Sequence, residues 1–272
     1  MQTQATVAAQ FLALHSGASP LLLPNPWDQG SARLLAWLGF EALGTTSSGL
    51  ATTKGRLDGS LSRDEALSHA AEVVAAVEVP VSADLENGFG DRPDAVAEAV
   101  RLALDAGLAG CSIEDFTGRR DDPIYDVALA TERMTAASEV AHGGSVHLVL
   151  TGRCENYLHG HPDLDSTIAR LQAYQEAGAD VLFAPGLTDL DEIRQVVASV
   201  DRPVSVLGLA RGPTVSELAG VGVARISVGG GLCFAALGAV VEAATELKER
   251  GTFGYWDRAT AGLRAARAAF VP

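Results

Sequence analysis

The sequence predicts a (β/α)8 barrel of parallel strands, because short apolar strands and amphipathic helices alternate along the whole chain. In four segments a glycine closes a helix, an apolar strand follows, and a polar or glycine-rich loop comes next. These segments begin at Leu38, Ala106, Ala177 and Val221. Four interleaved strands, each after a proline or a short loop, span 21–25, 79–84, 146–153 and 202–208. Eight regular, almost wholly apolar units favour a closed barrel over the alternative, a doubly wound open sheet.

Helical patterns lie between these strands, and several begin at a residue suited to capping a helix. The clearest patterns span 62–78, 93–106, 125–142, 163–177 and 188–199. The expected caps are Ser62, Asp163 and Thr188. Since no linker or low-complexity stretch divides the chain, residues 1–272 are predicted to form a single domain. An alanine-rich helical tail at about 256–272 could pack on a neighbouring subunit, as a swapped helix, or cover its own barrel.

Composition and charge limit the classes of function. The chain has 272 residues and 47% hydrophobic content, which is enough to bury a large core. The formal net charge of −14 argues against nucleic-acid and anionic-membrane partners, because each phosphate contact needs a cation. Apolar runs end well before the roughly 20 residues of a membrane span, and no signal-peptide pattern opens the chain, so a cytoplasmic protein is expected. The three cysteines are far apart and are expected to be reduced.

Polar side chains stand where the apolar strands end. In a barrel the loops that follow the strands meet at one rim, which is where such barrels carry their active sites. The residues expected there are Asn25, Thr46, Ser47, Ser48, Asp84, Glu86, Glu114, Asp115, Arg153, Glu155, Ser205 and Ser227. Partly buried acids repel one another unless a positive charge lies between them. Carboxylate ligands suit Mg2+ or Mn2+ better than zinc, so the sequence predicts a hard divalent cation at this rim.

Several of these segments together resemble the isocitrate lyase and phosphoenolpyruvate mutase superfamily. "SADLENGFG" is similar to its Asp-x-Asp-x-Gly-(Tyr/Phe)-Gly signature. The other matching segments occur in the same order, over essentially residues 15–255; they are "LPNPWDQGSAR", "TSSGLATTKGRLDG", "GCSIED" and "TGRCEN". One motif alone would be weak, but the ordered set is specific.

The resemblance implies a role for each matching side chain. Asp84 matches the acid that contacts the metal, whereas the acids that hold the metal's waters are matched by Asp58, Glu86 and Glu114. Arg153 matches the arginine that binds a substrate carboxylate. The loop that takes a carboxylate through its backbone N–H groups and a hydroxyl is matched by Thr46, Ser47 and Ser48. On this basis Arg153, Asp58 and Glu114 are the expected catalytic residues.

The activity implied is that of a Mg2+-dependent lyase. Its substrate would be a small 2-hydroxy or 2-oxo carboxylic acid, cleaved at a carbon–carbon bond through an enolate, and decarboxylation fits the same site. Carbon–phosphorus chemistry on phosphonopyruvate or phosphoenolpyruvate is the alternative, and a non-catalytic 2-oxo acid binding protein is a second one. The superfamily also implies a homo-oligomer, commonly a tetramer.

Two departures from the superfamily pattern leave the reaction open. Glu86 stands where the commonest pattern has aspartate, so its carboxylate reaches one methylene further. The segment after Glu114, "EDFTGRRDDPIYD", contains neither the Lys-Arg-Cys-Gly-His type loop of the lyases nor the Pro-Lys-Thr-Asn-Ser type loop of the phosphonomutases. Its charged residues, 119–122, could form a mobile lid or an exposed surface loop.

The remaining candidates favour structural interpretations. His159 and His161 flank Gly160, and without a third ligand nearby they are expected on a surface loop. A Schiff-base aldolase would need a lysine at a strand end. Lys54 and Lys248 do not lie at strand ends, which argues against that mechanism.

Overall fold

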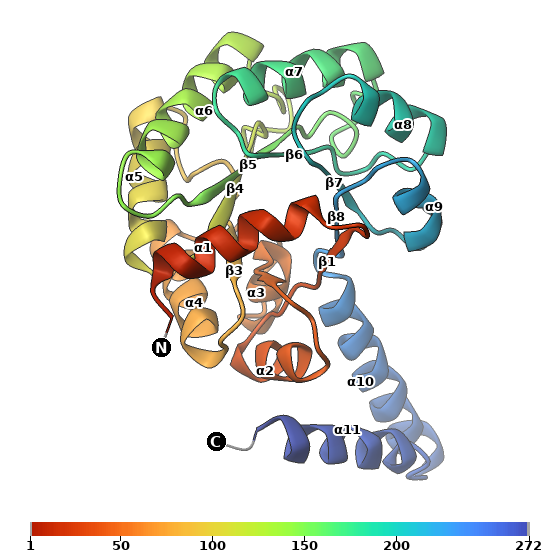
Figure 1. Cartoon of the computed structure of the whole chain (residues 1–272). Helices are drawn as coiled ribbons and strands as arrows, with labels where there is room; N and C mark the ends of the chain where they lie inside the picture. The colour runs from red at the N-terminus through yellow and green to blue at the C-terminus, as the bar shows by residue number, and fades with distance from the viewer. Residues whose placement is uncertain (1, 271–272) are drawn as a thin grey trace.

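Eight parallel strands form a barrel in the computed structural model, which describes residues 2–270 (Figure 1). Every strand expected from the sequence is present, so the prediction of a (β/α)8 barrel is confirmed. The strands are β1 (Leu21–Leu23), β2 (Leu43–Gly44), β3 (Val81–Asp84), β4 (Gly110–Glu114), β5 (Val149–Arg153), β6 (Val181–Phe183), β7 (Val204–Leu207) and β8 (Arg225–Ser227).

The strand order is β1-β8-β7-β6-β5-β4-β3-β2, with β1 and β2 at the two edges. The edges are joined just beyond β1. The Gly44 amide donates to the Pro24 carbonyl at 3.0 Å, and the Asn25 side chain donates to the carbonyls of Gly44 and Thr45 at 3.0 and 3.1 Å. Asn25 also accepts from the Val228 amide at 2.9 Å. Asn25, expected at the rim, therefore closes the barrel.

Helices follow most of the strands around the outside of the barrel, while others precede the first strand or project after the last one. They are α1 (Gln4–Ala13), the short 3-10 helix η1 (Leu14–Ser16), α2 (Gln29–Trp37), α3 (Ser47–Thr53), α4 (Arg63–Ala76), α5 (Pro93–Asp105), α6 (Val127–His142), α7 (Leu164–Glu176), α8 (Leu190–Ala198), α9 (Val215–Gly220), α10 (Gly231–Arg250) and α11 (Trp256–Ala269). Ser62 and Asp163 cap α4 and α7 as predicted. The cap expected at Thr188 was wrong by one residue, because Asp189 accepts the amides of Asp191 and Glu192.

Alternate residues of each strand face opposite sides, which divides the core in two. Outward-facing residues such as Leu150 and Leu182 pack with the surrounding helices. Inward-facing Val149 and Val181 instead pack with Phe11 of α1. Helix α1 lies across the amino-terminal end of the strands (Figure 1). That end is closed, so the opening is at the carboxyl-terminal end, where the predicted site residues lie.

The last two helices project from the barrel (Figure 1). Helix α10 leaves Val240 and Val241 more than 60% exposed. The expected tail at 256–272 is helix α11, except that residues 271 and 272 lie outside the described part of the chain. Among residues 2–270 we find no helix that combines the length and the apolarity needed to cross a bilayer.

Candidate active site

The turn after β3 holds a strained backbone at the predicted metal site. Glu86 and Phe89 have φ angles of 48° and 60°, in the left-handed region that side chains other than glycine rarely adopt. Arg133 of α6 donates to the carbonyls of Asn87, Gly90 and Asp91 in this turn. Strained positions that the surrounding structure fixes in this way are common at functional sites.

Asp84, the last residue of β3, is fixed by the neighbouring backbone. Its Oδ2 accepts the amide of Ser47 at 3.2 Å, and its Oδ1 accepts the amide of Glu86 at 3.3 Å. The Asp84 amide donates to the Thr45 hydroxyl at 3.0 Å. The carboxylate is therefore oriented before any ligand binds.

Arg153 forms ion pairs with acids at or next to the ends of three strands. Glu114 and Arg153 are register partners on β4 and β5, and the carboxylate of Glu114 lies 3.1 Å from Nη1 of Arg153. The Asp84 carboxylate lies 3.6 Å from the same nitrogen, and Glu155 accepts from Nε at 2.5 Å. The guanidinium also lies over the Phe183 ring, 5.3 Å from its centroid. No hydrogen bond from Nη2 is found within residues 2–270.

Burial and like charges act together on these acids. Burial raises the pKa of Glu114 well above its usual range, although Arg153 opposes the effect, while Glu155, Asp84 and Glu86 add to it. Burial would also raise the pKa of Glu155, but Arg153 and His159 outweigh it and the net pKa is lowered. The cluster therefore holds more carboxylate charge than its one arginine balances.

Glu86 is the carboxylate without a partner. Its Oε1 is buried and makes no hydrogen bond within the described part of the chain. Burial, together with Asp84 and Asp58, raises the pKa of Glu86 to about 8, against the lowering effect of Arg153. A buried unpaired oxygen is costly unless a ligand satisfies it. With Asp84 and Glu114 beside it, this all-oxygen donor set fits a hard divalent cation such as Mg2+ or Mn2+.

The remaining predicted residues lie around the same opening. Asp58 is exposed on the loop between α3 and α4, where it borders the cavity beside Glu86 and Glu114. Thr46 caps α3 by accepting the Gly49 amide at 3.4 Å, and its hydroxyl lies 3.0 Å from that of Ser48. The Ser47 amide is engaged by Asp84. The structure thus brings Thr46, Ser47, Ser48, Asp58, Asp84, Glu86, Glu114 and Arg153 to one end of the barrel.

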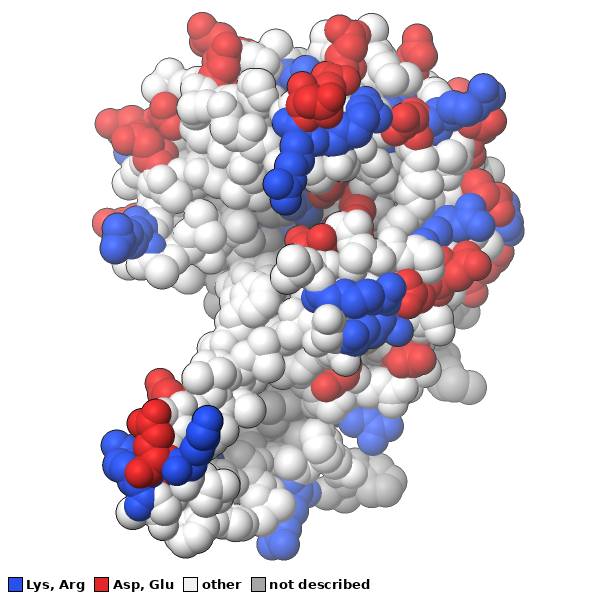
Figure 2. Space-filling view, turned by 180° about the vertical axis from the view of Figure 1, so that it is seen from behind, with Lys and Arg blue, Asp and Glu red and all other residues white. Residues whose placement is uncertain are grey.

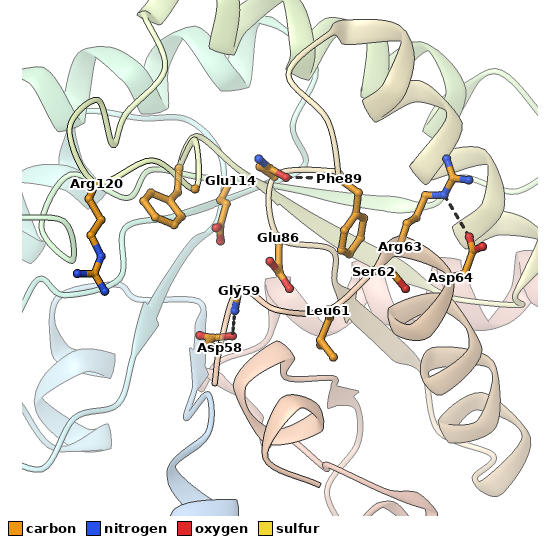
Figure 3. A pocket seen from close by; sticks show the side chains of 13 residues that line it. Asp58, Gly59, Leu61, Ser62, Arg63, Asp64, Glu86, Phe89, Glu114 and Arg120 are labelled. Carbon is orange, nitrogen blue, oxygen red and sulfur yellow. Dashed lines mark hydrogen bonds and ion pairs between the residues drawn. The ribbon is translucent and has the colours of Figure 1, made fainter. Parts of the chain in front are cut away.

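Two connected spaces meet at these residues. The larger has a volume of about 730 Å³ and opens beside Glu86, Glu114 and Asp58 (Figure 3). The second, of about 200 Å³, lies beside Asp84 and Arg153. Asp58 borders both spaces. In Figure 2 acidic atoms are visible in a hollow of the barrel and basic side chains stand at its edge.

His159 lies on the loop after β5, as expected, but it is half-buried and also lines the cavity of the candidate site. It stacks on Phe116 with the ring centroids 3.7 Å apart, and its Nε2 lies 3.1 Å from Oε2 of Glu155. Both rings line the cavity beside Arg153. Glu155 and His159 are four residues apart, and that spacing was the available signal. The stacking partner comes from a distant loop and could not be found by spacing; His161 stays exposed.

The charged loop after β4 is partly anchored. Arg119 pairs with Asp91 at 3.2 Å and with Asp122 at 3.3 Å. Arg120 borders the larger cavity opposite Glu86 (Figure 3). The loop therefore combines a fixed surface segment with one cation directed to the opening.

A separate cluster of possible metal ligands lies outside the predicted site. His142 ends α6, while His147 and Asp180 precede β5 and β6, which places the three at the amino-terminal end of the strands. Their ligand atoms lie within 4.8 Å of one another. Each histidine Nε2 is 3.0 Å from an oxygen of Asp180, and the two rings stack 4.1 Å apart. The side chain of His147 is 46% exposed.

Comparisons with known proteins cover nearly the whole barrel. The family model described as phosphoenolpyruvate phosphomutase matches residues 11–248. An uncharacterized protein of Mycobacterium tuberculosis is 35% identical over 220 residues, 80% of this chain and 81% of that one. The 2-methylisocitrate lyase of Bacillus subtilis is 27% identical over 212 residues, 74% of this chain and 67% of that one. A crystal structure from Burkholderia cenocepacia, provisionally assigned as a lyase/mutase, has a TM-score of 0.95 at 53% identity and covers 99% of this chain and 97% of its own.

Proposed function

This chain belongs to the phosphoenolpyruvate phosphomutase family, within the isocitrate lyase and phosphoenolpyruvate mutase superfamily, and from that premise we propose that it is a divalent-metal-dependent carbon–carbon lyase. Its substrate would be a small 2-hydroxy or 2-oxo carboxylic acid. The observation that carries the proposal is the buried, unpartnered Oε1 of Glu86, among carboxylates that share one arginine. The similarity to the Bacillus subtilis 2-methylisocitrate lyase supports cleavage as the reaction.

Each side chain has a distinct task in this proposal. Asp84, Glu86 and Glu114 would hold Mg2+ or Mn2+, directly or through water, and Asp58 would close the site from its loop. The ion would supply positive charge that offsets negative charge developing on the substrate. Arg153 binds the substrate carboxylate through its Nη2, while the loop of Thr46, Ser47 and Ser48 borders the same space. Because Asp84 and Glu114 already fix the guanidinium, little ordering is left for the binding step.

A cleavage reaction requires a proton donor. The segment after Glu114 contains no cysteine loop that could supply the proton. His159 lines the cavity with Glu114 and Arg153, and Glu155 orients its ring. We assign His159 as the proton donor. His159→Asn should then lower kcat about 100-fold and leave oxalate affinity unchanged, whereas His161→Asn, two residues along the loop, should change neither. Equal activity of the two variants would exclude this role.

Titration calorimetry with oxalate tests the site itself. Oxalate should bind in the presence of Mg2+ and should not bind after EDTA treatment. Asp84→Asn should abolish the Mg2+ effect, while Glu41→Gln, at an exposed position, should keep it. Oxalate binding that is indifferent to metal in the unaltered protein would refute the proposed site.

An activity screen then separates the possible reactions. The panel contains isocitrate, methylisocitrate, oxaloacetate, substituted malates and phosphonopyruvate. The description of the matching family model keeps carbon–phosphorus chemistry as the second candidate. Phosphate release or rearrangement of phosphonopyruvate would identify it. Metal-dependent binding with no turnover of any member would instead identify a non-catalytic 2-oxo acid binding protein.

A homo-oligomer is part of the proposal. Helix α10 exposes Phe234, Leu237, Val240 and Val241, which would be buried if a second copy packed on it. Light scattering should then give a mass above that of one chain, and Val241→Glu should lower it. A monomer in solution would contradict this part alone.

A further inference from the structure

The interior of the barrel directly beneath the acidic cluster is polar. Ser82, Ser112 and Thr151 precede Asp84, Glu114 and Arg153 by two residues on β3, β4 and β5. Residues two apart on a strand face the same side, so the hydroxyls form the next layer inward, roughly 6 Å below the acids. Branched aliphatic side chains usually fill this layer in a (β/α)8 barrel. A hydroxyl layer needs a separate explanation.

Arg225, the first residue of β8, crosses this layer. Its Nε donates to the Ser205 hydroxyl at 3.0 Å, and its Nη2 donates to the Thr151 hydroxyl at 3.1 Å. Its Nη1 lies 3.3 Å from Nε2 of His15. The residue is only 3% exposed. Among residues 2–270 no carboxylate pairs with it, in contrast to Arg153.

None of the partners of Arg225 neutralises its charge. The hydroxyls are neutral, and His15 places its Nδ1 2.9 Å from the Phe11 carbonyl, which leaves Nε2 as the acceptor. Burial lowers the pKa of His15 to about 4 and that of Arg225 to about 9. A buried cation without an anion is destabilising, and barrels do not need one for closure. Three of the five guanidinium N–H groups are used within the described residues, so two remain for a ligand.

One cavity connects this arginine with the candidate active site. The space of about 200 Å³ is bordered by Asp84 and Arg153 at the rim and by Arg225 in the interior. Ser82 and Ser112 line it between them. Space, hydroxyl donors and an unpaired cation therefore occur together on the inner side of the site.

We propose that Arg225 is an anion subsite inside the barrel, which takes the second carboxylate of a dicarboxylic acid whose reacting end lies at Arg153. The inference rests on the proposed function and deepens it by naming the substrate class. The free N–H groups of Arg225 bind the distal carboxylate, and Ser82 and Ser112 complete its surroundings. Arg225 is a specificity residue here, since it contacts the end of the substrate that does not react.

Two probes of equal length test the subsite. Malate and 2-hydroxybutanoate share the 2-hydroxy acid end and differ only in a terminal carboxylate or methyl group. With Mg2+ present, calorimetry should show malate binding about 10- to 100-fold more tightly, as expected for a charge-assisted pair. No preference for malate in the unaltered protein would overturn the proposal without any variant. Oxalate tests only binding at the proposed metal site. A failure of oxalate to bind in the presence of Mg2+ would therefore count against the proposed function and not against the subsite.

Substitution of the arginine identifies the residue responsible. Arg225→Met should remove the preference for malate while leaving oxalate and 2-hydroxybutanoate affinities within about twofold, and Arg225→Lys should retain part of the preference. Arg170→Met is the control, because Arg170 is a largely buried arginine that pairs with Asp115 outside the barrel interior. Arg170→Met should lower the Tm and keep the preference. An Arg225→Met variant that still prefers malate would refute the subsite.

Discussion

At the amino-terminal end of the barrel, Asp180 accepts hydrogen bonds from His142, His147 and the Leu150 amide, whereas at the other end four carboxylates surround Arg153 alone. In each cluster a carboxylate that is less than 10% exposed, Asp180 or Glu114, lies beside nitrogen-bearing side chains. In the first, both carboxylate oxygens have donors. In the second, an oxygen of Glu86 has no donor within residues 2–270. We infer that the cluster around Asp180, here called the balanced cluster, stabilises the fold. The cluster around Arg153 instead has a free acceptor that a ligand can satisfy.

Removal of Arg153 should have the largest effect. Arg153→Ala leaves Glu114, Glu155 and Asp84 without their shared cation, so the free energy of unfolding should fall by about 3 kcal/mol in EDTA. Mg2+ should restore part of this loss, because it replaces positive charge in the same place. Turnover should fall by at least about 100-fold. Urea unfolding with and without Mg2+ measures the first effect, and a variant as stable as the unaltered protein would show that these acids do not need Arg153 to balance their charge.

Asp180→Ala should be the next in size and should affect stability alone. The change leaves three donors without an acceptor, and we expect the free energy of unfolding to fall by about 2 kcal/mol. The kcat and oxalate affinity should not change, since the cluster lies at the closed end of the barrel. A loss of activity that exceeds the loss of folded protein would show that the two ends are coupled.

Glu86→Gln should act in the opposite direction. Burial and the neighbouring acids raise the pKa of Glu86 to about 8, so folding at neutral pH must protonate this carboxylate at a cost in free energy. The amide removes that cost, so the protein in EDTA should gain about 1 kcal/mol of unfolding free energy. The same variant should lose the Tm increase that Mg2+ gives the unaltered protein. Glu41→Gln, at an exposed position, is the control and should do neither. A Glu86→Gln variant that is destabilised in EDTA would mean that the carboxylate has a partner in solution.

The smallest expected effect is the pH dependence of the stability that Asp180 of the balanced cluster contributes. Burial would raise the pKa of Asp180, but the hydrogen bonds from His142, the Leu150 amide and His147 lower it overall. A carboxylate whose pKa is lower in the folded state than in the unfolded state stabilises the protein at pH values above its unfolded-state pKa, about 3.9. The protein loses that contribution as the pH falls through the folded-state pKa. The stability difference between the unaltered protein and Asp180→Ala should therefore shrink as the pH is lowered below about 4. A constant difference across this range would show that Asp180 contributes by packing alone.

Sequence reasoning recovered the strands and most of the candidate site because both depend on local signals. An apolar strand that ends in a charged side chain marks the rim of a parallel barrel, and this rule found Asp84, Glu114 and Arg153. The same rule included Asp115, which turns instead to Tyr174 and Arg170 outside the barrel. The position of a residue on its strand predicts the end of the barrel at which it lies. It does not predict which residues its side chain contacts.

The sequence by itself determined the eight-stranded barrel, the end at which its polar side chains gather, and the excess of acids there. Only the tertiary structure decided that Glu86 has an oxygen without a hydrogen-bond donor in the described part of the chain, that His159 stacks on Phe116, and that Arg225 is buried with no carboxylate partner among residues 2–270. The physical reason is that alternation and capping act over a few residues, whereas the environment of a charge depends on strands far apart in the chain. Register and closure place those strands side by side, and no local pattern encodes the result.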